Sequence, residues 1–122
     1  MKEVTDAQRK KIQRYLALDE DELYSLIPPH LSEYERTLFA PLGMIGAGKA
    51  FFEKVYNDLK KAVCEEFDWP SKRSNPEFDD TVTLVAAISD VLAGCIGAVP
   101  PFIIATLLVK KGLDALCGSS KK

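Results

Sequence analysis

The stretch from Val82 to Val109, VTLVAAISDVLAGCIGAVPPFIIATLLV, is the most apolar part of the chain and decides its fold class. A membrane-spanning helix needs about 20 consecutive apolar residues. Here Pro100 and Pro101 divide the run, and Asp90 lies inside its first half. An aspartate at the centre of a membrane helix costs about 2.5–3.5 kcal/mol. We therefore expect two globular helices that pack together as the core pair of a helical bundle.

A membrane interpretation of the same stretch stays open. Lys110 and Lys111 follow the apolar run, as a cationic flank follows a membrane segment. The alternative hypothesis is therefore a small membrane-active protein that inserts residues 82–109 as a helical hairpin.

Composition and charge exclude several broad classes of protein. Of the 122 residues, 47% are hydrophobic and 28% are charged, which is typical of a globular protein and excludes a wholly disordered chain. This length predicts one domain. The net charge of −2 provides no overall attraction to nucleic acid or to anionic lipid, so a nucleic-acid partner is not expected.

The N-terminal sequence and the cysteines both favour a cytoplasmic location. Residues 1–15, MKEVTDAQRKKIQRY, contain no apolar signal-peptide core. The three cysteines, Cys64, Cys95 and Cys117, are odd in number and widely spaced. We expect reduced thiols that are buried as small apolar groups, and no disulfide framework.

Capping residues predict where several helices begin. A side-chain oxygen at the position before a helix accepts a hydrogen bond from an amide that the helix leaves unpaired, and a Glu three residues later completes a capping box. Helix starts are predicted at Thr5 or Asp6, at Asp19 with Glu22, at Ser32 with Glu35, and at Asp79 or Asp80.

The predicted helices together define an all-α fold. The longest helix is expected from residue 42 to residue 67, where apolar residues recur at three- and four-residue steps. With the short N-terminal helices and the C-terminal core pair, we predict a single-domain bundle of five to six helices over residues 1–118. A disordered tail is expected at residues 119–122.

The segment from Gly43 to Lys49, GMIGAGK, matches the glycine-rich core of a P-loop. That motif requires Ser or Thr at the next position to hold magnesium, and this chain has Ala50 there. No strand is predicted before the segment either. We interpret the small residues as a flat helix face that packs closely, either within the chain or against a second copy. A nucleotide-dependent enzyme that uses Lys49 is the least favoured hypothesis.

Residues 68–79 are predicted to be a loop, because they include two prolines, an asparagine and two serines. Trp69 beside Lys72 and Arg73 forms a candidate interaction surface, since loops on a rigid scaffold often bind partners. The alternative is that Trp69 and Phe78 fold back and fix the ends of the loop.

Asp90 is the one charged residue within the expected core pair. A buried carboxylate without a partner is costly. Asp90 is therefore expected at the edge of the bundle, in an ion pair with Arg or Lys, or at an interface, and it joins the candidate interaction surface.

The sequence contains no recognisable catalytic arrangement. No Ser-His-Asp, Cys-His or paired-carboxylate pattern is present, and His30 is the single histidine. We predict no enzyme activity, no cofactor and no bound metal. The leading hypothesis is a non-enzymatic protein–protein interaction or adaptor domain, or an accessory subunit of a larger complex. The expected partner is another protein, and a homodimer is the alternative.

Overall fold

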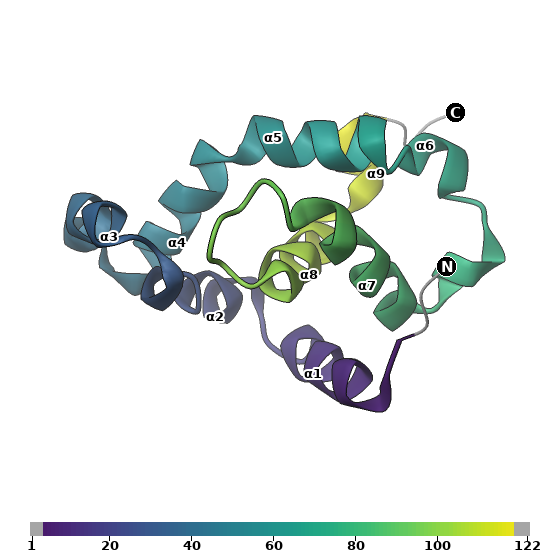
Figure 1. Ribbon diagram of the computed structural model, residues 1–122, viewed down its shortest axis with the longest axis horizontal. Helices are drawn as coiled ribbons and strands as arrows, with labels where there is room; N and C mark the ends of the chain where they lie inside the picture. The colour runs from purple at the N-terminus through teal and green to yellow at the C-terminus, as the bar shows by residue number, and fades with distance from the viewer. Residues whose placement is uncertain (1–3, 119–122) are drawn as a thin grey trace.

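The computed structural model describes residues 4–118, which form an all-α fold without a β-strand in that range. The described part of the chain contains nine α-helical segments, which are joined by short 3₁₀ turns and one π-helical turn, η3. Figure 1 shows their arrangement. The predicted tail, residues 119–122, lies outside the described residues. In chain order the elements are α1 (Asp6–Leu16), α2 (Glu20–Ser25), η1 (Pro28–His30), α3 (Glu33–Phe39), η2 (Ala40–Leu42), α4 (Gly43–Lys54), α5 (Tyr56–Lys61), η3 (Ala62–Glu66), α6 (Trp69–Lys72), η4 (Pro76–Asp79), α7 (Thr81–Leu92), α8 (Pro101–Lys111) and α9 (Leu113–Cys117).

Helices α7 and α8 pack against each other at the centre of the molecule (Figure 1). Every residue of α8 from Ile103 to Leu108 is buried, because α1, α2 and α9 also contact this helix. On α7, the side chains of Val85, Ile88 and Leu92 are fully enclosed. Burying one such aliphatic side chain stabilises the fold by about 1.5–3 kcal/mol, so this pair contributes a large part of the hydrophobic free energy.

Capping boxes begin three of the helices. In each box the first side chain accepts a hydrogen bond from the backbone N–H three residues later, and the later side chain accepts one in return. The predicted boxes at Asp19–Glu22 and Ser32–Glu35 are confirmed, and the Thr5 N-cap forms a third with Gln8.

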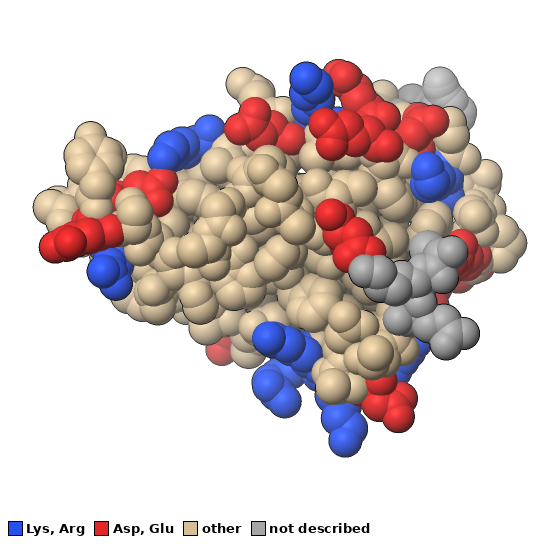
Figure 2. Space-filling model, viewed as in Figure 1, with Lys and Arg blue, Asp and Glu red and all other residues tan. Residues whose placement is uncertain are grey.

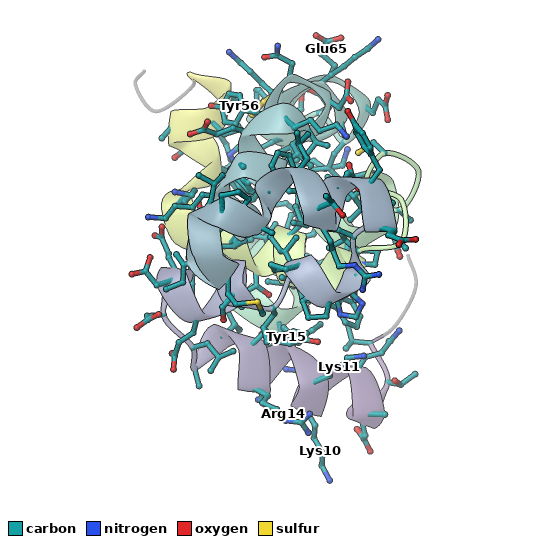
Figure 3. All side chains as sticks on the ribbon, turned by 90° about the vertical axis from the view of Figure 1, so that its left-hand side faces the viewer. Lys10, Lys11, Arg14, Tyr15, Tyr56 and Glu65 are labelled. Atoms are coloured by element: carbon teal, nitrogen blue, oxygen red, sulfur yellow. A yellow bond between two sulfur atoms is a disulfide. The ribbon has the colours of Figure 1, made fainter. Side chains whose placement is uncertain are left out.

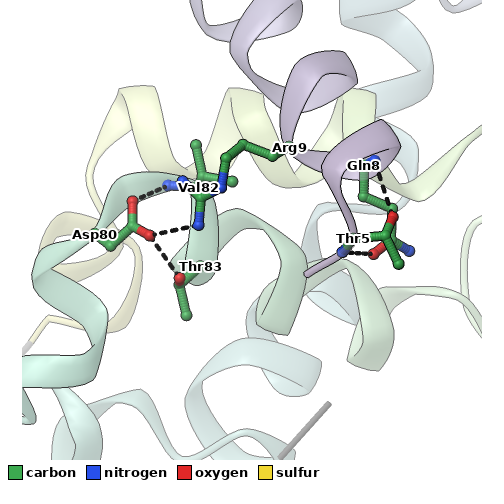
Figure 4. A network of polar contacts seen from close by, with 6 residues as sticks. All are labelled: Thr5, Gln8, Arg9, Asp80, Val82 and Thr83. Atoms are coloured by element: carbon green, nitrogen blue, oxygen red, sulfur yellow. Dashed lines mark hydrogen bonds and ion pairs between the residues drawn. The ribbon is translucent and has the colours of Figure 1, made fainter. Parts of the chain in front are cut away.

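Asp80 caps α7, as predicted, and also joins this helix to α1 (Figure 4). Its carboxylate accepts hydrogen bonds from the Val82 N–H at 3.2 Å and the Thr83 hydroxyl at 2.7 Å. The same carboxylate pairs with Arg9 at 3.1 Å. The Thr83 and Arg9 hydrogen bonds lower the pKa of Asp80. An exposed ion pair contributes at most about 1 kcal/mol to stability. The Arg9–Asp80 pair therefore orients α1, whereas the burial of apolar side chains holds this helix against the core.

Helices α2 and α4 approach each other at Gly48. A Cβ atom built on Gly48 would lie 2.0 Å from the backbone oxygen of Tyr24. The small-residue face is therefore used, at this position, for close packing within the chain. Gly43–Lys49 lies entirely within helix α4 rather than in a loop after a strand, and Lys49 pairs with Asp21 of α2 at 3.7 Å.

The prediction of one helix from 42 to 67 is wrong in its continuity. The chain bends at Val55 between α4 and α5, and η3 follows α5 (Figure 1). Phe52 on α4 packs toward Tyr24 of α2, whereas Leu59 and Val63 are enclosed further along. The bend lets one apolar stripe follow the curved surface of the core.

Two further predictions of element boundaries are corrected. Residues 68–79 contain α6 and η4, because Pro70 and Pro76 occupy first-turn positions, where proline favours a helix. The C-terminal part of the bundle predicted over residues 1–118 is divided between α8 and α9 at Gly112, whose φ of +103° is a conformation that suits glycine. Both breaks raise the number of helical segments above five or six.

The expectation of reduced cysteines is wrong for two of the three. Cys64 of η3 and Cys117 of α9 form a disulfide with their Cα atoms 5.5 Å apart. The 53-residue separation hid this pairing, because only the fold brings η3 and α9 together. Cys95 is the free thiol. The cytoplasmic expectation thereby loses the support that it took from reduced thiols.

Candidate protein-interaction site

Trp69 is an internal contact rather than an open surface. The side chain is 8% exposed, and its Nε1 donates a hydrogen bond to Asp114 Oδ1 at 2.8 Å. Phe78 is also buried and packs against Phe67 with ring centroids 5.6 Å apart. The structure therefore has the alternative arrangement, in which Trp69 and Phe78 fold back and are buried.

The two cations next to Trp69 also make contacts within the chain. Arg73 donates two hydrogen bonds of 2.8 Å to the two carboxylate oxygens of Asp114. Lys72 donates to the Phe67 backbone oxygen at 2.6 Å, and its ammonium lies 4.9 Å from the centre of that ring. The predicted residues 69, 72 and 73 thus lie together on and beside α6, where they hold α9 and η3.

Asp90 lies apart from this cluster. It is exposed on α7, and among residues 4–118 it forms no ion pair. Asp90 was expected at the edge of the bundle, in an ion pair or at an interface. The structure excludes an ion pair with another residue of the range 4–118. A role of Asp90 at an interface stays a prediction.

The largest exposed apolar side chains gather elsewhere, where α3 leads through η2 into α4. Helix α3 buries none of its residues completely. We call the exposed side chains the α3–α4 patch, and their exposed fractions range from 40% to 75%: Tyr34, Leu38, Leu42, Met44 and Ile45. This part of the chain forms one end of the molecule, on the left in Figure 1.

None of these five side chains belongs to the predicted interaction surface of Trp69, Lys72, Arg73 and Asp90. A seven-residue helix can bury only one side, and in the structure that side carries Glu35 and Phe39, which are partly buried. The signal that could have revealed the patch is the presence of apolar residues on two sides of so short a helix.

A groove lies beside the patch, between α3 and α4 on one side and the connection from α7 to α8 on the other. We call this hollow of about 480 Å³ the Cys95 groove. Its apolar lining includes Leu31, Phe51, Val55, Ile96 and Val99. Its polar lining includes His30, Ser32, Glu35, Lys54 and Cys95.

The electrostatics of the Cys95 groove are uneven. Glu35 and Lys54 form an ion pair across one part of it, and the hydrogen bond from Lys54 lowers the pKa of Glu35. At the other part, burial raises the pKa of the Cys95 thiol, and the negative charges of Asp58 and Glu66 raise it further. The thiol is therefore protonated at neutral pH and is a poor nucleophile.

A second hollow, of about 320 Å³, surrounds Tyr24 between α2, α4 and α8. Lys111 pairs with Glu20 at 3.2 Å and lies 5.5 Å from the centre of the Tyr24 ring. A hydrogen bond with Tyr24, and then one with Glu20, raises the pKa of Lys111. Because Lys49 is likewise paired with Asp21, this hollow leaves no lysine free for an anionic ligand.

Charged side chains that lack partners lie at opposite ends of the molecule. Lys10 and Arg14 extend from α1 at the lower end of Figure 3, with Lys11 on the same helix, and Glu65 lies at the upper end. None of the four forms an ion pair with another described residue. None of these four residues lines either of the hollows described above, so we assign no site there.

Residues 4–118 contain neither a metal-binding cluster nor a membrane-spanning helix. No group of three or more His, Cys, Asp or Glu side chains is placed to hold a metal ion. None of the helices in this range combines the length and the apolar character needed to cross a bilayer. Comparison with known proteins gave no match either to a family model, to a curated protein or to a solved structure.

Proposed function

We propose that this protein is a non-enzymatic interaction module that binds a protein partner through the α3–α4 patch. The observation that carries the proposal is the exposure of five large apolar side chains on adjoining elements. Exposed apolar patches of this kind on folded proteins commonly mark binding surfaces. Single exposed leucines are ordinary, but Tyr34 and Leu38 stand one helical turn apart and continue into Leu42.

The chemistry of the grooves supports a binding role over a catalytic one. His30 and Cys95 line the same groove, which is the one place where a Cys-His pair is conceivable. A catalytic cysteine needs a lowered pKa, whereas the pKa of Cys95 is raised. The apolar lining of that groove is suited to holding side chains of a partner.

The test is partner capture with variants of the patch. Wild-type protein, Tyr34→Lys and Leu38→Lys are each used as bait in extract from the native cells, with chemical cross-linking and mass spectrometry. Because both side chains are mostly exposed, we expect stability changes within about 0.5 kcal/mol and loss of one specific partner from both variants. Tyr56→Lys is the matched control, since Tyr56 is 39% exposed but lies outside the patch.

Light scattering after size-exclusion chromatography shows whether that partner is a second copy. A dimer that Leu38→Lys converts to a monomer would identify the patch as a homodimer interface. Equal capture of the same proteins by wild type and by both patch variants would contradict the proposal.

A further inference from the structure

We propose that the Cys95 groove accepts a segment of a partner protein that presents one or two bulky apolar side chains next to Lys or Arg. This inference rests on the proposed function, since it names the chemistry of the partner and places part of it beside the α3–α4 patch. Three observations carry it: the apolar lining, the size of the groove, and the charge at one end.

The lining and size suit a bulky apolar anchor. Phe51 comes from α4, Val55 from the bend after it, and Ile96 and Val99 from the connection between α7 and α8. All four present hydrocarbon to the groove. A volume of about 480 Å³ falls within the range of about 300–1,000 Å³ that is usual for ligand pockets. An aromatic or branched aliphatic side chain would lose its water-exposed surface there, which is favourable.

The negative charge near the Cys95 end of the groove favours a basic residue next to the apolar side chain of the partner. Asp58 and Glu66 lie outside the lining of the groove, but their negative charges act on the Cys95 thiol at its edge, and neither carboxylate forms an ion pair with another described residue. Figure 2 shows several acidic side chains and a basic one over α5 and η3, along the edge of a broad stretch without charged residues that covers the connection between α7 and α8. A Lys or Arg of the partner placed there would be attracted by the carboxylates of Asp58 and Glu66. It would not have to displace a cation of this chain that is ion-paired with them.

The opposite preference is disfavoured by the same geometry. Lys54 is the lysine that lines the groove, and it is already paired with Glu35. An acidic or phosphorylated segment would therefore be repelled by the two carboxylates that act on Cys95, while the lysine of the lining is already occupied by Glu35. The charge of the partner thus separates this proposal from recognition of an anionic motif.

The experiment uses three fluorescein-labelled peptides and the full chain. The probe is Gly-Ser-Leu-Phe-Lys-Arg-Lys-Ser; one comparison peptide has Glu in place of its three basic residues, and the other has Ala in place of Leu and Phe. We expect saturable fluorescence anisotropy for the probe and binding at least tenfold weaker for both comparison peptides. Because Cys95 is the free thiol, bound probe should also slow its alkylation at least threefold.

Charge and shape variants locate the binding. Asp58→Lys and Glu66→Lys should each weaken probe binding at least threefold, and together at least tenfold, whereas Glu65→Lys, the adjacent exposed carboxylate, should stay within twofold of wild type. Ala98→Trp adds bulk at an exposed position of the lining and should abolish binding. Circular dichroism verifies that each variant is folded.

Several outcomes overturn the inference. Absence of binding by the probe, equal binding of the acidic peptide, or unchanged binding by folded Ala98→Trp each does so. If the probe fails while partner capture still depends on Leu38, the inference about the groove falls and the proposed function stands. If the probe binds as expected while capture is insensitive to Tyr34 and Leu38, the role of the patch falls instead.

Discussion

The backbone oxygen of Tyr24 lies so close to Gly48 that a Cβ atom at position 48 would stand 2.0 Å from it. No real Cβ contact is that short, and the obstacle is backbone rather than a flexible side chain. Helices α2 and α4 can therefore approach each other this closely only because residue 48 has no side chain. The Tyr24 ring, stacked edge-on to Phe52 with centroids 5.7 Å apart, completes the contact.

Gly48→Ala is expected to destabilise the protein by about 1–3 kcal/mol, although Ala favours helix by about 1 kcal/mol at an ordinary position. The reason is that α2 must move away from α4 to admit a methyl group. Urea unfolding followed by circular dichroism measures the change. Gly94→Ala is the control, because a Cβ there meets nothing within 4 Å; a similar loss in both variants would contradict the close contact as the cause.

Asp114→Ala is expected to lower the free energy of unfolding by about 1–3 kcal/mol. The variant removes the acceptor of the Trp69 indole and both acceptors of Arg73, and Trp69 is left with a buried donor. Asp114→Asn keeps one oxygen for Trp69, so we expect it to lose less.

The fluorescence of Trp69 reports this change directly, because the chain has one tryptophan. Denaturant titration with emission at each step gives both the stability and the environment of the ring. An emission maximum and midpoint identical to wild type in Asp114→Ala would show that this contact contributes nothing.

Reduction of the Cys64–Cys117 disulfide is expected to destabilise the protein by about 2–4 kcal/mol, mainly because the reduced unfolded chain regains freedom. The bond closes a loop with a sequence separation of 53 residues. Thermal unfolding with and without reductant measures the effect, with Cys95→Ser as the control. Alkylation should modify one thiol without reductant and three thiols with it. Three modified thiols in both conditions would contradict the prediction.

Glu35→Gln tests the ion pair at the rim of the Cys95 groove. The pKa of Glu35 lies below its ordinary value of 4.5, chiefly because of Lys54, so the native state favours the carboxylate. That stabilisation is complete at pH values above the ordinary pKa and is lost as pH falls through the lowered native pKa. The wild type should be more stable than Glu35→Gln by about 1 kcal/mol at pH 7.

The two stability curves should converge in acid, as both side chains become uncharged. Gln also fits the third position of a capping box, so the variant preserves the cap with Ser32 and isolates the charge. Unfolding midpoints between pH 2.5 and pH 7 give the comparison. A difference between the two proteins that does not change with pH would argue against a role of the carboxylate charge.

Local signals made part of the fold predictable. The caps at Asp19, Ser32 and Asp80 act on amides two or three residues away, so a short window of sequence contains both partners. Pro100 and Pro101 divided the apolar stretch for an equally local reason, since proline cannot continue a helix that precedes it. The sequence could not place the bend at Val55, because that bend depends on which surfaces α4 and α5 cover.

The candidate site was harder to predict because exposure is not a local property. Trp69 and Tyr34 are both aromatic residues beside prolines or charges in the sequence, yet one is 8% exposed and the other 75%. The difference is that Asp114, 45 residues away, comes to lie beside Trp69, whereas no segment within residues 4–118 covers Tyr34.

The sequence alone determined three features: the all-α class, the interruption of the C-terminal apolar stretch and the capped helix starts. These were predictable because backbone propensity and capping act over a few residues. The tertiary structure alone decides the disulfide between Cys64 and Cys117, the Tyr24–Gly48 contact and the exposure of the α3–α4 patch. Each of these depends on how segments distant in sequence meet, or fail to meet, when the core around α7 and α8 closes.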